Sequence, residues 1–299
     1  MSGIDKFSKW ICKTIYRSTH AKKYHHNKNL WPFFKVDRYA SGQLGDVYFK
    51  RHRITNIDLH ICEKTKPLVI MATGPSVNQI DRRFFDDSFD YLGVNGAFSM
   101  RNVHFEWYVI IDRDFVRERL SLVKEIVARE ELVLFCTYNS LDSIFSNIPF
   151  KDVRCQIKIF ETASSSLINR FLLSRCPINN SNDHYHWHQN FGFSDKIEEV
   201  LFDYGTVTYP ALQIACLLGY KQIYIVGLDM NNFNTPRFYE SSQDKLGTRL
   251  NLDFDNINHS FLAAQDYCQS HNIQVVNLSP ESAIDAFPKM RWDNLHITA

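Results

Sequence analysis

Hydrophobic residues occur in short continuous runs from about residue 66 onward, and longer amphipathic segments separate these runs. A run of four to six apolar residues bounded by turn-forming residues is typical of a strand that is buried on both faces. The predicted strands are residues 68–72, 91–94, 107–111, 132–136, 157–160, 222–226 and 273–278.

Helical patterns fill several of the intervals between these runs. We predict helices over residues 115–129, 209–218 and 255–270. Pro210 stands in the first turn of the second helix, where proline is tolerated. Gly219 follows this helix directly, and glycine is typical of the position after a helix C-terminus. Strands that alternate with helices predict an α/β protein with a mostly parallel sheet and helices on both faces. Residues 174–200 show no clear period and are predicted to form a loop or lid.

The first 62 residues differ from the rest, so we predict an N-terminal extension over 1–62 and a main domain over 63–299. Up to Lys28 there are seven Lys or Arg residues against one acid, Asp5. Hydrophobic residues there recur at helical spacing: Phe7, Trp10, Ile11 and Ile15. Such a basic amphipathic helix can lie on an anionic membrane surface. Packing on the main domain or contact with an acidic substrate would fit the same pattern.

Composition narrows the class of protein further. The formal net charge of +1 gives no basic field for nucleic acid, so no nucleic-acid partner is expected. The seven cysteines are scattered, odd in number and never form CxxC, which is typical of reduced thiols in a cytosolic protein. The N-terminus lacks the apolar stretch of a signal peptide, and no run of about 18 apolar residues occurs. We therefore expect a cytoplasmic protein.

Polar residues and glycines follow three of the predicted strands. They are Thr73-Gly74-Pro75-Ser76, Asn95-Gly96 and Gly227-Leu228-Asp229. In a parallel sheet, ligands bind at the carboxyl ends of strands, where glycine allows close approach and a helix N-terminus offers N–H groups to phosphate. A carboxylate such as Asp229 can accept hydrogen bonds from ribose hydroxyls. Each motif by itself is weak evidence for a binding site, because Gly and Asp follow many strands simply as turn-forming residues.

Three segments together resemble bacterial sialyltransferases that use CMP-sialic acid. They are ATGPSVNQID (72–81), VNGAF (94–98) and GYKQIYIVGLDM (219–230). With KTIYRS (13–18) and NKNLWPFFKV (27–36), the chain looks still more like the WaaZ-type Kdo transferases of the lipopolysaccharide core. The resemblance implies a Rossmann-like nucleotide-sugar fold of the sialyltransferase GT-A variant. Kdo and sialic acid are both 2-keto sugar acids activated by CMP, so one nucleotide pocket could serve either.

The resemblance also implies roles for individual residues. Gly74, Pro75 and Ser76 would hold the CMP phosphate, Asn95 would contact the nucleotide, and Asp229, with Gly227 and Leu228 before it, would hold the ribose. Thr73 and Asp112 stand where the sialyltransferases have Asn. A carboxylate at Asp112 would be unfavourable beside a phosphate without a nearby cation or proton.

Two segments suggest metal binding. Asp112-Arg113-Asp114 is a DxD triplet directly after a strand, an arrangement that holds a divalent metal in many nucleotide-sugar transferases. Alternatively, Asp112 ends the strand and Asp114 caps the next helix. His184, His186 and His188 alternate, so an extended segment would place them on one side. Because no Cys or acidic cluster accompanies them, an aromatic and polar loop, such as a lid over acidic sugars, is the more typical reading. Because CMP-sugars carry one phosphate, we expect no required metal or other cofactor.

Transfer with inversion needs a general base for the acceptor hydroxyl. The sialyltransferases use a His shortly before the last helix, and alignment here offers Asp255 and His259, one helical turn apart. They are predicted as catalytic residues. Donors before the Pro210 helix could stabilise the leaving phosphate, as could residues after the strand at 222–226. These are Tyr204, Thr206, Thr208 and Tyr209 in the first group, and Arg237 and Tyr239 in the second.

The resemblance thus implies a glycosyltransferase that moves Kdo from CMP-Kdo to a lipopolysaccharide inner-core sugar. It would work as a peripheral protein at the cytoplasmic face of the inner membrane. The alternatives are a sialyltransferase, an ATP-dependent pterin diphosphokinase-like enzyme, and a non-catalytic protein that binds core oligosaccharide.

Overall fold

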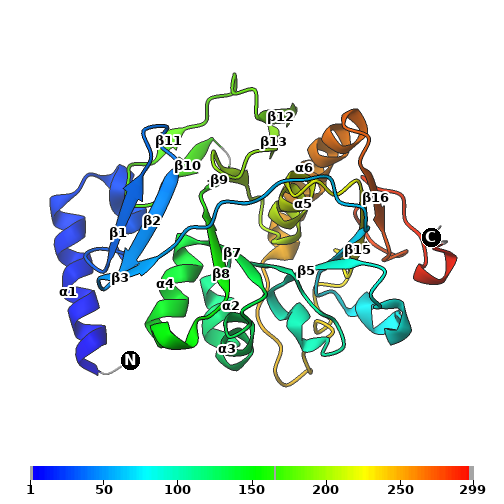
Figure 1. The fold of residues 1–299 in the computed structure, drawn as a ribbon, viewed down its shortest axis with the longest axis horizontal. Coiled ribbons are helices and arrows are strands. Elements are labelled where there is room, and N and C mark those ends of the chain that lie inside the picture. Colours follow the sequence, from blue (N-terminus) through cyan, green and yellow to red (C-terminus); the bar gives the residue numbers. More distant parts are fainter. Residues whose placement is uncertain (1–2, 165, 296–299) are drawn as a thin grey trace. The chain divides into compact units, whose positions relative to one another are not determined.

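The computed structural model describes residues 3–164 and 166–295, which fall into two compact units (Figure 1). The first unit consists of Met1–Asp58, Ile110–Ser181 and Lys196–Leu201. The second consists of Leu59–Val109, Asn182–Asp195 and Phe202–Ala299. The N-terminal segment therefore shares its unit with two later stretches of the chain. Each unit is described below by itself.

Five parallel strands form the sheet of the second unit, in the order β16-β15-β4-β5-β6. Their bounds are β4 Leu68–Met71, β5 Asp90–Val94, β6 Trp107–Ile110, β15 Gln222–Val226 and β16 Gln274–Asn277. Strand β6 carries the chain from this unit into the first. Because all five strands run in one direction, their carboxyl ends meet at one edge of the sheet, which we call the carboxyl edge.

Both faces of this sheet are covered, since every residue of β4 is buried. Tyr91 and Tyr224 both pair with Val69 and so share one face, which packs against Phe89 and neighbouring aromatic rings. The α-helices α5 (Thr208–Leu217) and α6 (Leu250–Ser270) pack against each other and the sheet. The predicted α/β class, with a parallel sheet flanked by helices, is confirmed.

Shorter elements complete the second unit. The 3-10 helices are η2 Pro75–Gln79, η3 Arg82–Phe84, η4 Asn95–Ser99 and η6 Trp292–Asn294. Strands β12 (Tyr185–His188) and β13 (Phe191–Ser194) form an antiparallel hairpin that packs on α6. The interpretation of residues 174–200 as a loop or lid was therefore wrong for this part. Its strands are four residues long and mix polar with aromatic side chains, so they do not appear in the sequence as continuous apolar runs.

The first unit combines a parallel pair of strands with antiparallel sheets. Strands β7 and β8 are parallel, β1-β2-β3 is antiparallel, and β9, β10, β11 and β14 form a further sheet. The strand bounds are β1 Phe34–Arg38, β2 Leu44–Phe49, β3 His52–Ile54, β7 Val133–Thr137, β8 Gln156–Phe160, β9 Thr162–Ser164, β10 Leu167–Asn169, β11 Cys176–Pro177 and β14 Leu201–Phe202. The helix bounds are α1 Gly3–Thr19, η1 Lys22–Asn27, α2 Arg113–Glu118, α3 Leu120–Val127, α4 Tyr138–Asn147 and η5 Phe150–Asp152.

The helix predicted over 115–129 is in fact two helices, α2 and α3. The break falls at Arg119, whose backbone angles (φ −121°, ψ 40°) lie outside the helical region. Across the part of the chain that the structure describes, no helix combines the length and apolar character needed to cross a bilayer.

Candidate functional site

A buried hydrogen-bonded clamp joins the segments that follow β4 and β15 at the carboxyl edge. The Ser76 backbone N–H donates to Asp229 Oδ2 at 2.9 Å, and the Ser76 hydroxyl donates to Asp229 Oδ1. Asp229 is only 5% exposed. Charge-assisted hydrogen bonds of this kind are among the stronger ones in proteins, so the carboxylate fixes the two strand ends relative to each other.

Ser279, which follows β16, extends the clamp to a third strand end. Its Oγ lies 2.9 Å from Ser76 Oγ and accepts a hydrogen bond from the Gly227 N–H at 3.2 Å. Because Ser76 already donates to Asp229, Ser279 is the donor in the hydroxyl pair. Ser279 is not among the residues predicted from the sequence, although it is a polar residue just after a strand, as Asp229 is.

Gly74 is placed where only glycine fits. Its N–H donates to the Gly227 carbonyl at 2.9 Å, and a Cβ built on it would lie 2.5 Å from Asp229 Oδ2 and 2.6 Å from Gly227 O. Gly227 itself has a φ of +73°, which glycine adopts at no steric cost. In the structure, the group that approaches this glycine closely is the neighbouring strand end. Leu228 has a buried side chain, and its carbonyl accepts from Asn277 Nδ2 at 3.2 Å.

The segment that follows Thr73 does not form an α-helix. The chain forms the 3-10 helix η2, which starts at Pro75, spans five residues and has no side-chain cap. Pro75 has no N–H, and the Ser76 N–H is used by Asp229. A turn this short adds little dipole for a phosphate. Thr73 takes part in a backbone hydrogen bond, in which its carbonyl accepts from the Phe238 N–H at 3.2 Å.

Asn95, at the end of β5, has an unused hydrogen-bond acceptor. Its backbone has a φ of +46°, and its carbonyl accepts from the Tyr108 hydroxyl at 2.6 Å. Its Oδ1 is buried and has no hydrogen-bond partner among the residues that the structure describes. A buried polar atom without a partner costs free energy unless a ligand or water satisfies it. The next residue, Gly96, lies against the ring of Tyr239, which leaves no room for a Cβ.

The residues around the start of α5 form a second group in the same unit. Tyr204 OH accepts from the Gly192 N–H at 2.7 Å, and Tyr209 OH donates to the Gly192 carbonyl at 2.8 Å. Burial raises the pKa of Tyr204 to about 12. Both tyrosines thus hold β13, while Thr206 and Thr208 are buried beside them.

Asp255 and His259 lie exposed on α6, one turn apart. His259 Nδ1 is 2.7 Å from the Asp255 carbonyl oxygen, and its ring stacks on Phe191 with centroids 5.7 Å apart. A carbonyl only accepts, so Nδ1 carries the proton and Nε2 of the neutral ring is an acceptor. This is the tautomer that a general base needs.

The length of α6 places these two residues near the carboxyl edge. The helix turns back into β16 through residues 271–273, at the opposite edge of the sheet. His259 stands eleven residues before the helix end at Ser270, which corresponds to about 17 Å along the axis. The four residues of β16 span about 13 Å. Among the described residues, no hydrogen bond links Asp255 or His259 to the Ser76–Asp229 clamp.

Asp112 belongs to the first unit, whereas the other residues predicted to bind the nucleotide belong to the second. Its side chain accepts from the Asp114 N–H at 2.7 Å and so caps α2, where we had weighed Asp114 as the cap. Asp114 pairs with Arg117 at 3.1 Å. Within residues 3–164 and 166–295, no group of three or more His, Cys, Asp or Glu side chains could hold a metal ion.

The alternating histidines hold the β12–β13 hairpin in place. His184 Nδ1 and His186 Nε2 lie 2.8 and 2.9 Å from the two oxygens of Asp195, and His188 Nδ1 lies 2.7 Å from Asp266 on α6. Arg237, a candidate for the leaving phosphate, instead pairs with Glu240 at 2.8 Å.

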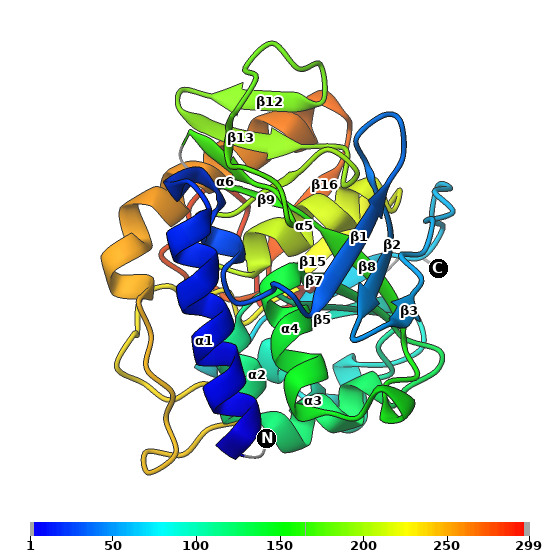
Figure 2. The ribbon, with the colours of Figure 1, turned by 90° about the vertical axis from the view of Figure 1, so that its left-hand side faces the viewer.

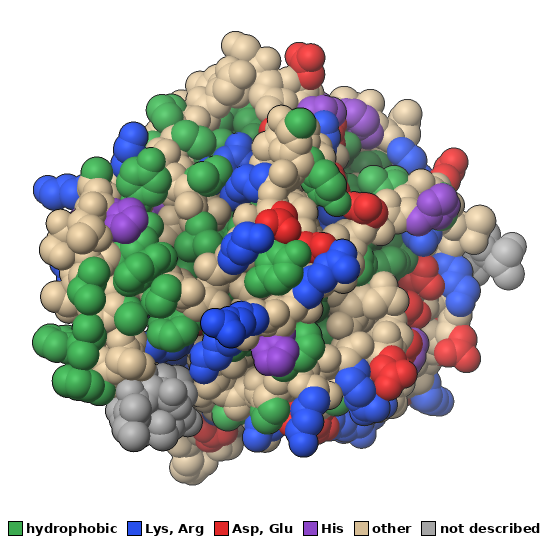
Figure 3. Space-filling model, turned by 60° about the vertical axis from the view of Figure 1, so that its left-hand side comes forward, with side chains coloured by type: hydrophobic (Ala, Val, Ile, Leu, Met, Phe, Trp, Pro, Cys, Tyr) green, Lys and Arg blue, Asp and Glu red, His purple; other side chains and the backbone are tan. Residues whose placement is uncertain are grey.

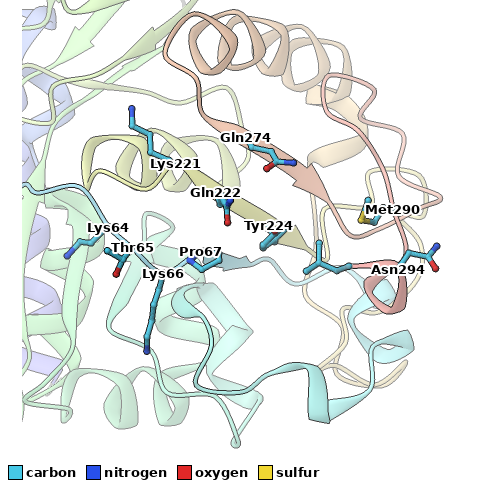
Figure 4. A pocket seen from close by; sticks show the side chains of 11 residues that line it. Lys64, Thr65, Lys66, Pro67, Lys221, Gln222, Tyr224, Gln274, Met290 and Asn294 are labelled. Carbon is cyan, nitrogen blue, oxygen red and sulfur yellow. The ribbon is translucent and has the colours of Figure 1, made fainter. Parts of the chain in front are cut away.

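A cavity of about 580 Å³ lies at the amino ends of β4, β15 and β16 (Figure 4). Lys64, Lys66 and Lys221 line it, and Figure 4 shows that they point in different directions. Lys66 donates to the Asp87 carbonyl at 2.8 Å and Lys221 to the His271 carbonyl at 3.2 Å. This is the edge opposite to the one where parallel sheets bind ligands, so we do not assign the catalytic site to it.

No protein-family model and no curated protein matches this chain. Solved structures of a sialyltransferase, CstII from Campylobacter jejuni, are similar to this protein over much of the length of this chain. The complex with the substrate analogue CMP-3FNeuAc is 15% identical, covers 78% of this chain and 90% of that chain, and has a TM-score of 0.44. The complex with a trisaccharide acceptor and CMP is also 15% identical, covering 78% and 89% with a TM-score of 0.43. Such scores are too low to transfer a function.

Proposed function

We propose that this protein is a CMP-sugar-dependent glycosyltransferase that moves Kdo from CMP-Kdo to a lipopolysaccharide inner-core sugar. One observation supports this most: the motifs that carry the sequence resemblance meet in space. Gly74 and Ser76 come from one motif and Gly227 and Asp229 from another, and these residues bind one another at the carboxyl edge. This is the edge where α/β folds bind nucleotides.

Asn95 is the residue that we assign to direct recognition of the nucleotide. No donor from the described part of the chain reaches its buried Oδ1, and the cytosine amino group or a ribose hydroxyl could supply one. Asp229 would act chiefly by positioning the loops. Ser76 uses two of the roughly four acceptor positions on that carboxylate, which leaves the others for a ribose hydroxyl.

For the general base we favour His259 over Asp255. The hydrogen bond from His259 Nδ1 to the Asp255 carbonyl leaves Nε2 free to accept the proton of an acceptor hydroxyl. The backbone of Asp255 thus orients the imidazole, a role that does not need its carboxylate. The proposal requires no metal, because the leaving group is a monophosphate and Asp112 and Asp114 are engaged within α2.

The alternatives differ in the donor. A sialyltransferase would use the same nucleotide pocket with another 2-keto sugar acid, and a pterin diphosphokinase-like enzyme would need ATP and magnesium. A non-catalytic oligosaccharide-binding protein would release no nucleotide. Because the proposed acceptor is lipid-linked, we place the reaction at the cytoplasmic face of the inner membrane.

A transfer assay with the full-length protein tests the proposal. We expect that CMP-Kdo plus lipopolysaccharide core gives a product heavier by one Kdo residue, with an equal amount of CMP released, as measured by mass spectrometry and chromatography. CMP-sialic acid should react at least about tenfold more slowly, a difference of about 1.4 kcal/mol in transition-state binding. Faster transfer from CMP-sialic acid would shift the assignment to the sialyltransferase, and turnover of ATP alone would contradict it.

A further inference from the structure

Helix α1 of the first unit exposes a row of hydrophobic side chains along its length. Phe7 is 64% exposed, Trp10 62%, Ile15 44% and Ile11 36%, and the rings of Phe7 and Trp10 stack at 6.2 Å. Figure 3 shows hydrophobic side chains gathered over this helix. Several large apolar side chains exposed side by side on one surface usually mark a binding surface.

The opposite face of α1 is the one that packs on its unit. Tyr16 is buried there, and Lys9 Nζ donates to Ser146 Oγ at 2.7 Å and to Asp142 Oδ1 at 3.2 Å. Both partners lie on α4, beside which α1 runs (Figure 2). Packing therefore uses the side of the helix that carries Lys9 and Tyr16 and leaves the apolar row outside. An ordinary surface helix would be oriented the other way round.

Positive charge flanks the apolar row on one side. Lys13 and Arg17 are one turn apart on α1, next to the face that carries Trp10. Burial and the nearby positive charges of Lys13, Arg17, Arg113 and Arg175 lower the pKa of Lys28. Four cationic side chains thus repel the ammonium group of Lys28. An anionic partner would relieve that repulsion.

We propose that α1 docks on an anionic lipid bilayer through a face made of Phe7, Trp10, Ile11, Ile15, Lys13 and Arg17. The apolar row would enter the boundary between headgroups and acyl chains, and the flanking cations would bind lipid phosphates. Exposed Phe and Trp side chains beside Lys and Arg on one helix face are typical of helices that lie in the interface of an anionic bilayer, and this combination favours lipid over a protein partner. This inference does not depend on the proposed transferase activity.

Vesicle sedimentation with the full-length protein, in the absence of nucleotide, tests the docking face. Vesicles of phosphatidylethanolamine with about one-third phosphatidylglycerol are compared with vesicles of phosphatidylcholine, which probes the charge requirement. The apolar variant is Phe7→Ser with Trp10→Ser, and its matched control is Ile61→Ser with Leu252→Ser, which are 54% and 72% exposed elsewhere. The charge variant is Lys13→Glu with Arg17→Glu, matched by Lys124→Glu with Lys151→Glu on exposed sites.

We expect the wild-type protein to sediment with anionic vesicles only, and less so as salt rises. Each docking-face variant should bind at least about tenfold more weakly, whereas both controls bind like wild type. All variants change exposed or half-exposed residues and should keep the wild-type melting temperature. Absence of wild-type binding, or equal binding by the docking-face variants, would overturn the proposal. So would self-association of the wild type through α1, seen as dimers that these variants abolish without any vesicle binding.

Discussion

Replacing His259 by alanine should lower the turnover of CMP-Kdo by about 10²–10⁴-fold, the usual contribution of a general base. The acceptor hydroxyl loses its proton in the transition state, and Nε2 of His259 is the acceptor that α6 presents near the carboxyl edge. Affinity for CMP should stay nearly unchanged, because the base acts on the other substrate. Steady-state turnover and calorimetric titration of CMP measure the two effects separately.

Two companion variants sharpen this prediction. Asp255→Ala keeps the backbone carbonyl that orients the imidazole, so turnover should fall far less than with His259→Ala. His60→Ala removes another exposed histidine of the same unit and should leave turnover at the wild-type level. A large loss with Asp255→Ala and none with His259→Ala would make Asp255 the base. Full activity of both would remove α6 from the mechanism.

A methyl group at Gly74 should be among the most damaging small changes to this chain. The new Cβ of Gly74→Ala would lie 2.5 Å from Asp229 Oδ2 and 2.6 Å from the Gly227 carbonyl oxygen. Neither atom can move without disturbing the clamp to Ser76, so we expect a loss of about 3 kcal/mol in the free energy of unfolding. Chemical denaturation measures this loss, and CMP binding should be abolished along with it.

Gly247→Ala provides the matched control, since no atom lies within 4 Å of a Cβ built there. It should change the unfolding free energy by no more than about 0.5 kcal/mol. Equal stability of the two alanine variants would mean that the strand ends are not held together as described.

The parallel strands could be predicted because a strand that is buried on both faces appears in the sequence as a continuous run of apolar residues. The run at 222–226 matches β15 at both ends, and the run at 68–72 exceeds β4 by one residue. Helix α5 was also predictable, since it is buried all round and Gly219, whose φ is +93°, follows two residues after its end at Leu217. The antiparallel strands could not be found in this way. Strand β2 alternates buried and half-exposed residues, and its polar positions interrupt any run.

The candidate site was predictable in its location but not in its contacts. Rules for strand ends selected Ser76 and Asp229 as ligands for a nucleotide, yet the structure pairs them with each other. That pairing depends on β4 and β15 being neighbours in the sheet, although about 150 residues separate them. In the same way, the alternation of His184 and His186 raised a metal site as an alternative, because Asp195, nine residues after His186, was not recognised as their shared partner.

The central claim is that the carboxyl edge of the second unit binds CMP through Asn95, and calorimetric titration of CMP into wild-type protein and Asn95→Gly tests it most directly. Glycine removes the unpaired Oδ1 and tolerates the φ of +46°. The control is Asn272→Gly, at an exposed position with a φ of +54°. We predict that CMP binds in preference to UMP and ATP, and that Asn95→Gly alone weakens it about tenfold, or 1.4 kcal/mol. Equal CMP affinity of wild type and Asn95→Gly, or binding of ATP but not CMP, would contradict the account.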